Sequence, residues 1–206
     1  MRNNVFFRRP LSFLLCLCLP AALPAQVETG TDDNAQLPYW QWQSEGMSIR
    51  WIQRLPDQTR AFFSARQFRA EDAERIAQRC VFQTIYKNTA PATADTVITY
   101  DLADWRILPR GKDASQGIYS KEAWLALWQQ RQVPAAARIA FEWSLLPSRH
   151  RLLAGDYNWG MITFGLKPGA RFDLHIVWQK DGETKTATIP AMQCALDVHP
   201  QPASSE

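Results

Sequence analysis

The sequence predicts a mainly β fold: an immunoglobulin-like sandwich of two antiparallel sheets with two short inserted helices. Several short segments alternate apolar with polar residues between turn residues, as strands with one buried face do. Three of the last four predicted strands follow one another in hairpin-like succession, which favours two packed sheets over a parallel α/β sheet. No glycine-rich dinucleotide-binding pattern occurs, and 206 residues fit a single domain with short appendages.

The first 25 residues have the layout of a secretory signal peptide. Three arginines within the first nine residues precede an apolar run from Leu11 to Leu19, and small residues then lead to Ala25. The apolar run is shorter than the ~20 residues that a membrane-spanning helix needs. We therefore expect cleavage near Ala25, a periplasmic or secreted location and no stable membrane insertion. An uncleaved anchor is the alternative.

The chain after this segment carries no net charge. Of the 23 Lys and Arg residues three lie before residue 26, which leaves 20 basic residues against 20 Asp and Glu. Nucleic acids and acidic membranes bind concentrated positive charge. The composition therefore argues against a nucleic-acid partner and leaves a protein partner as the expectation.

Two cysteines remain once the predicted signal segment is removed. Cys80 and Cys194 form an even pair in a chain that we expect to enter an oxidising compartment, where disulfides persist. A bond between them would stabilise the fold by ~4–5 kcal/mol on the entropic model, because it closes a long loop. No histidine lies at a ligand-like spacing nearby, so a disulfide is favoured over a metal site.

The expected elements follow in chain order. Residues 26–38 are polar and predict a flexible lead-in to a single domain over residues 39–196. Alternation predicts the early strands, which cover residues 39–44, 47–55, 81–87, 96–102 and 105–108, with a weaker candidate over 60–68. Apolar residues at helical spacing predict a helix over 70–80. A second helix begins after Ser120 as N-cap, with Tyr119 and Trp124 as a hydrophobic staple, and ends before Pro134.

The last third of the chain carries the strongest strand signals. Residues 138–145 place Ile139, Phe141, Trp143 and Leu145 on one face of a predicted strand. Residues 156–166 are apolar on both faces, and Gly160 within them predicts a bulge or a close backbone approach. The last strands cover 172–179, 184–189 and 192–196; the first two are joined by an Asp-Gly turn, and Pro190 restricts the return strand to an edge or a bend. Residues 197–206 predict a disordered tail.

Two segments are candidate binding sites. Tyr39, Trp40 and Trp42 form an aromatic row separated by glutamine, which would stack on sugar rings or hold a peptide. An edge strand that packs over one sheet is the alternative. Arg149, His150 and Arg151 lie in a predicted loop between two strands, where they would bind an anion or act in acid–base chemistry. A solvent-exposed charged loop is the alternative for that segment.

No catalytic or cofactor motif is found. The chain lacks the G-x-S-x-G, H-E-x-x-H and paired C-x-x-C patterns, and no cofactor is predicted. Soft thioethers select copper in exported proteins, so convergence of Met47, Met161 and Met192 in space would indicate copper handling. These observations predict an exported, non-enzymatic binding or accessory module that recognises a protein partner. A carbohydrate- or peptidoglycan-binding module using Trp40 and Trp42, and a periplasmic copper-handling protein, are the alternatives.

Overall fold

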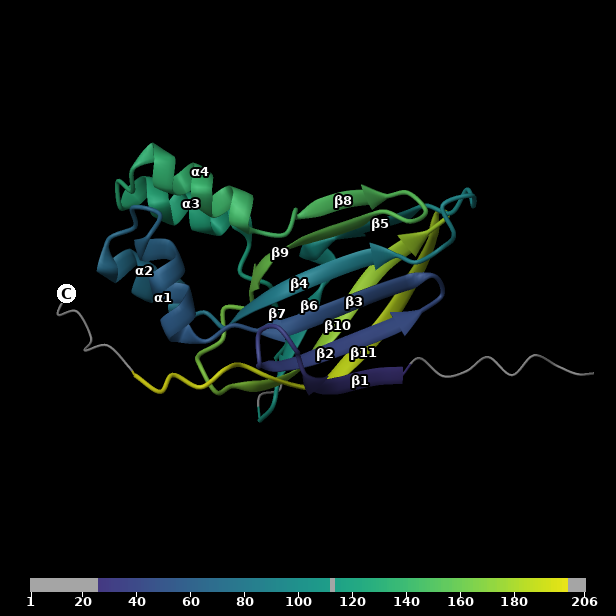
Figure 1. The fold of residues 1–206 in the computed structure, drawn as a ribbon, viewed down its shortest axis with the longest axis horizontal. Coiled ribbons are helices and arrows are strands. Elements are labelled where there is room, and N and C mark those ends of the chain that lie inside the picture. Colours follow the sequence, from purple (N-terminus) through teal and green to yellow (C-terminus); the bar gives the residue numbers. More distant parts are fainter. Residues whose placement is uncertain (1–25, 112–113, 200–206) are drawn as a thin grey trace, which may run out of the picture.

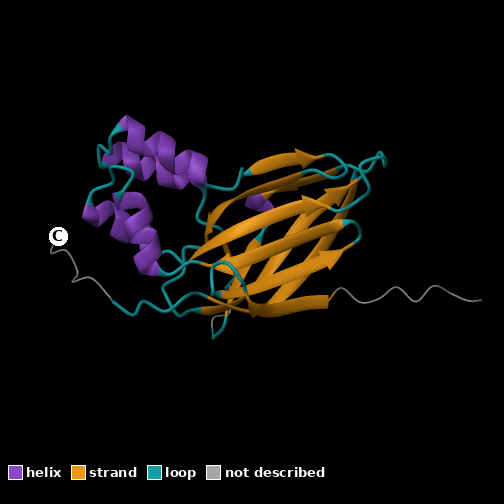
Figure 2. Cartoon of the chain, viewed as in Figure 1, coloured by secondary structure: helices purple, strands orange, loops and turns teal. Residues whose placement is uncertain are grey.

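The computed structural model describes residues 26–111 and 114–199. Within them the fold is mainly β, with two antiparallel sheets and four short helices, and the helices gather at one end (Figure 2). The predicted signal segment, residues 1–25, lies outside the described residues, as do residues 200–206 of the predicted tail. No helix of the described part is long and apolar enough to cross a membrane.

Sheet A has five strands in the order β1-β2-β3-β4-β9, all antiparallel to their neighbours. The strands are β1 (Gln26–Thr31), β2 (Pro38–Ser44), β3 (Met47–Gln53), β4 (Val81–Asn88) and β9 (Tyr157–Thr163). The edges of this sheet are therefore β1 and β9.

Sheet B has six strands in the order β7-β6-β10-β5-β8, with β11 paired to the other side of β10. The strands are β5 (Ile98–Asp101), β6 (Arg106–Pro109), β7 (Gln116–Gly117), β8 (Arg149–Leu152), β10 (Arg171–Lys180) and β11 (Glu183–Gln193). Figure 1 places β8 beside β9, so one side of the molecule carries an edge strand of each sheet.

The main core lies between the two sheets and confirms a sandwich-like arrangement. Alternate residues of each strand point inward, and their rings meet edge to face. Trp42 of sheet A lies 5.0 Å from Trp178 of sheet B, and Trp51 lies 6.2 Å from Trp105, between ring centroids. The Cys80–Cys194 disulfide is present, as predicted, with 5.2 Å between the Cα atoms, and both cysteines are buried in this core.

The four helices form a helical lobe with a core of its own (Figure 1). They are α1 (Pro56–Ser64), α2 (Ala70–Ala77), α3 (Lys121–Gln130) and α4 (Ala135–Ser144). The buried carboxylate of Asp72 on α2 forms ion pairs with Arg69 and with Arg131 at the end of α3, so it ties the two helix pairs together. The sequence predicts two helices, whereas the described structure has four, because α1 and α4 are not predicted.

Helix α4 replaces the strand that the sequence predicts most clearly, so that prediction was wrong. On a helix, side chains two residues apart point about 200° away from each other around the axis. The four residues predicted to share one strand face therefore lie on different sides of α4. Phe141 is buried in the helical lobe, whereas Ile139 and Trp143 are exposed. The alanines that begin α4 favour a helix, and the buried pair Ala137 and Phe141 has the i, i+4 spacing of a helix face.

Helix α1 corrects the weaker strand predicted over residues 60–68. Pro56 occupies the first turn, where its missing N–H costs nothing, and the Gln58 side chain accepts a hydrogen bond from the backbone of Leu55. Thr59 and Phe63 are fully buried four residues apart. These features identify a short helix. Its buried face contains so few residues that the sequence pattern favoured a strand instead.

Both ends of the described chain are more ordered than predicted. Residues 26–31, expected as part of a flexible lead-in, form β1 and pair with β2 along their whole length. Asp197, expected in the disordered tail, lies beside the guanidinium of Arg60, which also pairs with Asp57 and Glu74. The hydrogen-bonded ion pair with Arg60 lowers the pKa of Asp197, and a hydrogen bond with His199, followed by the one with Arg60, lowers the pKa of Asp57.

Several local predictions are confirmed. Ser120 caps α3 by accepting a hydrogen bond from the backbone of Ala123 (3.1 Å), and the Tyr119 and Trp124 rings are 4.7 Å apart. The Asp-Gly turn after β10 has positive φ at both residues, as a tight hairpin requires. The backbone of Leu146 passes so close to Gly160 that an added Cβ atom would lie 2.6 Å or less from it.

Candidate functional site

The structure buries the aromatic segment predicted to bind a ligand. Trp42 and Trp40 lie in the sandwich core with 2% and 8% of their surface exposed, and β2 is an inner strand of sheet A instead of an edge. Tyr39 faces outward, but it is covered by the guanidinium of Arg50, 3.5 Å from its ring centre. Its hydroxyl donates to Glu28, which raises the pKa of Tyr39. None of the three rings offers an open face to a sugar or a peptide.

The predicted basic segment forms edge strand β8, although a loop was expected. Arg149, His150 and Arg151 are exposed, and they line a cleft of about 590 Å³ on sheet B together with Thr99 and Gln179. Since β2 and β8 belong to different sheets, the structure does not bring the two predicted segments together.

Arg149 also links this cleft to a second one. Its Nε atom donates to Asp101, and both residues line a neighbouring cleft of about 480 Å³ that reaches Lys121 at the start of α3. The guanidinium of Arg149 is mostly exposed and already has a carboxylate partner, so its attraction for a further anion is weakened by solvent. The two clefts therefore carry the cations Arg149, Arg151 and Lys121 among their lining residues.

The methionines considered for copper lie apart. Met47 accepts a hydrogen bond from the buried hydroxyl of Tyr86 within the sandwich, whereas Met161 belongs to the core of the helical lobe. Burial raises the pKa of Tyr86. Met192 is buried in the sandwich core on β11. In residues 26–111 and 114–199, no group of three or more His, Cys, Asp or Glu side chains is placed to hold a metal ion.

A different set of aromatic residues is exposed. Trp143 on α4 exposes 87% of its surface, and Tyr157 and Trp159 on β9 expose 62% and 61%. A parallel bridge joins Leu145 to Met161, so α4 ends beside β9, and Trp143 and Trp159 each stand two residues before that bridge. We call Ile139, Trp143, Tyr157 and Trp159 the α4–β9 surface. Large exposed apolar patches mark interaction sites on protein surfaces.

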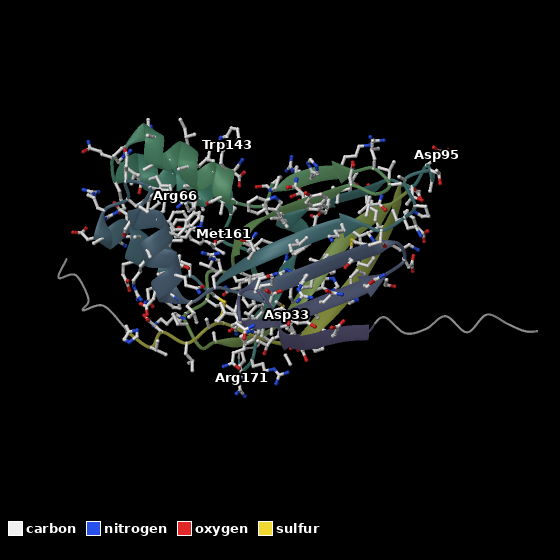
Figure 3. All side chains as sticks on the ribbon, viewed as in Figure 1. Asp33, Arg66, Asp95, Trp143, Met161 and Arg171 are labelled. Atoms are coloured by element: carbon white, nitrogen blue, oxygen red, sulfur yellow. A yellow bond between two sulfur atoms is a disulfide. The ribbon has the colours of Figure 1, made fainter. Side chains whose placement is uncertain are left out.

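Helix α4 contributes an apolar face on its exposed side. Ile139 and Trp143 are one turn apart and follow the exposed Ala136, so they continue a helical stripe. The opposite side of α4, with Ala137 and Phe141, packs into the helical lobe. Figure 3 labels Trp143 on α4 and shows it beyond the body of the helical lobe. A helix that is apolar on two sides is normally covered on both.

Strand β9 contributes an open sheet edge. It pairs with β4 on one side, and on its other side the backbone of Leu146 donates to the carbonyl of Met161 (3.0 Å). Because backbone groups alternate in direction along a strand, those of Tyr157 and Trp159 point to the same open side. The Trp159 N–H is satisfied by the side chain of Asn158 (2.8 Å). In the described structure, no strand forms backbone hydrogen bonds with the part of this edge that carries Tyr157 and Trp159.

The sequence contained a signal for this surface that alternation obscured. The sequence predicts a central strand, covered on both faces, for the segment that contains Tyr157 and Trp159, and it predicts a buried strand face for Trp143. The two-sided apolar pattern of α4 becomes visible only when residues 135–144 are arranged as a helix. Comparisons with protein-family models, with curated proteins and with solved structures found no match for this chain.

Proposed function

We propose that the protein is an exported, non-enzymatic binding or accessory module on an immunoglobulin-like scaffold, and that it recognises a protein partner through the α4–β9 surface. Export rests on the predicted signal segment, and the Cys80–Cys194 disulfide fits an oxidising compartment. The occupant of the surface is an extended segment of another protein, which adds a strand to β9. The observation that carries this proposal is that the open backbone edge and the exposed aromatic rings coincide on the same strand.

Strand addition uses both features of β9. Main-chain hydrogen bonds to the open edge supply affinity, and side-chain contacts on alternate residues supply specificity. The backbone of Tyr157 and Trp159 faces the open edge, and the rings of both residues stand on the outer face of sheet A. Large aromatic side chains dominate the energetics of protein interfaces because they bury much surface at little conformational cost. The Trp159 N–H donates to the side chain of Asn158, and a carbonyl of the partner segment would replace this hydrogen bond.

Charge favours a different protein over a second copy of this chain. Strands β3, β4 and β9 contain no Asp or Glu, and Lys87 on β4 is exposed, whereas Arg50 on β3 is already paired with Asp32. Lys87 pairs in register with Tyr157 and lies within reach of any strand added there. A two-fold interface needs a self-complementary surface, whereas a second copy would bring the same cations. An acidic extended segment complements the surface better.

The test is selection of peptides from a random display library on the purified full chain. We expect enrichment of extended sequences with apolar residues at alternate positions. Affinity for a selected peptide should fall at least about tenfold in Trp159→Ser and in Trp143→Ser, as loss of an interface aromatic typically costs. Leu108→Ser is the matched control, because Leu108 is an exposed apolar residue on sheet B. N-methylation of peptide amides that face β9 should also abolish binding.

Three outcomes would contradict the proposal. These are a selection without enrichment, enriched peptides whose affinity is unchanged in both tryptophan variants, and concentration-dependent dimers that Trp159→Ser dissociates. Binding of the same protein samples to a panel of glycans tests the carbohydrate alternative, since exposed rings also stack on sugars. Glycan binding that is lost in Trp143→Ser and Trp159→Ser, without peptide binding, would replace a protein partner with a carbohydrate.

A further inference from the structure

Arg54 is a partly buried cation without a counter-charge. It lies between β3 and α1, where its backbone N–H donates to the carbonyl of Val81 (3.0 Å). Its side-chain Nε atom is buried and has no hydrogen-bond partner, and no carboxylate of the described residues lies within ion-pair distance. The guanidinium carbon is 5.5 Å from the ring centre of Phe62 on α1.

A second arginine shares this ring. The guanidinium carbon of Arg66 lies 3.4 Å from the centre of Phe62, and Arg66 Nη1 donates to the Phe62 carbonyl (2.9 Å). Arg66 likewise has no carboxylate partner in the part of the chain that the structure describes. Burial lowers the pKa of Arg54, and the nearby positive charge of Arg66 lowers it further. Two positively charged guanidinium groups therefore contact the same aromatic ring.

Several other arginines with little exposed surface are neutralised within the fold. Arg60 pairs with three carboxylates, Arg131 with two, and Arg50 with Asp32. Removing a charge from water without a partner costs free energy, and a ring face compensates only in part. Arg79 and Arg138 also form no ion pair in the described structure, but only at Phe62 do two arginines without an ion pair contact the same ring among the described residues.

We propose that Arg54 and Arg66 form a carboxylate-binding site that receives an acidic side chain of the partner segment. This inference rests on the proposed function and specifies the chemistry of the partner. A guanidinium offers parallel N–H donors that match the two coplanar oxygens of one carboxylate, and charge-assisted bonds of this kind are strong. Carboxylate is favoured over phosphate because the occupant proposed for β9 is a protein segment.

The register of sheet A relates this site to the α4–β9 surface. Arg54 lies beside Val81, and Val81 pairs with Thr163, four residues along β9 from Trp159. At about 3.3 Å per residue along a strand and about 4.8 Å between strands, the Cα atoms of Arg54 and Trp159 are on the order of 16 Å apart. An extended segment covers that distance in about five residues. Figure 3 shows Arg66 near Met161, where the helical lobe meets sheet A.

The test titrates the nitrogen-15-labelled full chain with sodium succinate and with sodium phosphate at constant ionic strength. We expect the Nε–H resonances of Arg54 and Arg66 to shift with succinate, and to shift less with phosphate. Arg54→Met, which keeps the contact with Phe62 but removes the charge, should abolish the response. The same variant should bind selected acidic peptides roughly 10–100-fold more weakly, the usual cost of a lost hydrogen bond to a charged group. Without ligand, its melting temperature should equal or exceed that of the wild type.

Controls separate this inference from the proposed function. Arg171→Met removes an exposed arginine that Figure 3 places far from Arg66, and should change neither response. Trp159→Ser should lose peptide binding but keep the succinate shift, because the carboxylate site does not include β9. No succinate response in the wild type would overturn the inference while peptide binding persists. A stronger response to phosphate, or marked destabilisation by Arg54→Met without ligand, would overturn it as well.

Discussion

The sandwich and the helical lobe differ in how completely they cover their apolar residues. Between the sheets, inward-facing rings are matched by rings from the other sheet, as with Trp42 and Trp178. In the helical lobe, Phe141 is buried against Trp124 and Trp128, whereas Trp143 on the same helix is almost fully exposed. The sandwich is therefore closed, and the lobe leaves apolar surface for another molecule to cover.

The two edges of sheet A show the same difference. Strand β1 carries polar side chains, and the loop after it places Asp32 in an ion pair with Arg50. Hydrogen bonds from the backbone of Ala35, assisted by Arg50, lower the pKa of Asp32. Strand β9 instead presents two large rings beside an open backbone. Natural sheets usually protect their edges with charged residues or short strands. An open edge that carries aromatic side chains is therefore consistent with binding of another chain there.

The largest effect is expected at the disulfide within the core of the sandwich. The disulfide joins the segment after β11 to the junction of α2 and β4. The double variant Cys80→Ser, Cys194→Ser should lose about 4–5 kcal/mol of unfolding free energy, because the unfolded chain regains the entropy of a long loop. Urea denaturation measures it. A loss under about 1 kcal/mol would show that packing alone holds these two segments together.

The next effect contrasts the two sides of α4. Phe141→Ala should cost about 3–5 kcal/mol, because it leaves a cavity where the Phe63, Trp124 and Trp128 rings meet. Thermal unfolding followed by circular dichroism measures this loss. If Phe141→Ala were tolerated, the segment would not be packed as α4, and the strand predicted for residues 138–145 would return as the better description.

A smaller effect is expected from pH. The folded pKa of Asp197 is lowered by Arg60 and Gln78, so its ionised form stabilises the fold at pH values above its unfolded pKa of about 3.9. That contribution is lost as the pH falls through the folded pKa. Asp197→Asn should lower the melting temperature by a few degrees at pH 6. The difference should vanish near pH 2, and a difference that persists there would exclude the ion pair as its cause.

The smallest effect on stability is expected at the α4–β9 surface. Trp143→Ser and Trp159→Ser should each change the unfolding free energy by about 0.5 kcal/mol or less, because exposed side chains contribute little to folding. The same variants should abolish peptide binding. A destabilisation comparable to that of Phe141→Ala would mean that these rings support the fold and are unavailable to a partner.

Much of the sandwich follows from sequence alone, because alternation and turn chemistry are local properties. Residues 47–53 and 172–179, the capping Ser120 and the Asp-Gly turn behave as their patterns predict. Residues 138–145 mislead because apolar residues on both sides of a helix imitate a strand that is buried on one face. Only the packing shows which side is covered.

The candidate site was less predictable, because exposure is a property of the whole fold. The rings at Trp40 and Trp42 look available beside glutamine residues, yet β1 and β3 flank their strand and sheet B covers it. The missing counter-charge of Arg54 also has no sequence signature, since Arg60, six residues later, is fully neutralised by distant carboxylates.

Site-specific photo-cross-linking in cells that make the protein tests the central claim most directly. A photoreactive residue is placed at position 159, 143 or, as control, 108, and the cross-linked peptide is mapped by mass spectrometry. We predict that positions 159 and 143 capture one extended segment of another protein, with an acidic residue about five positions from the contact, and that position 108 does not. Capture of a second copy of this chain, or equal capture at position 108, would contradict the account.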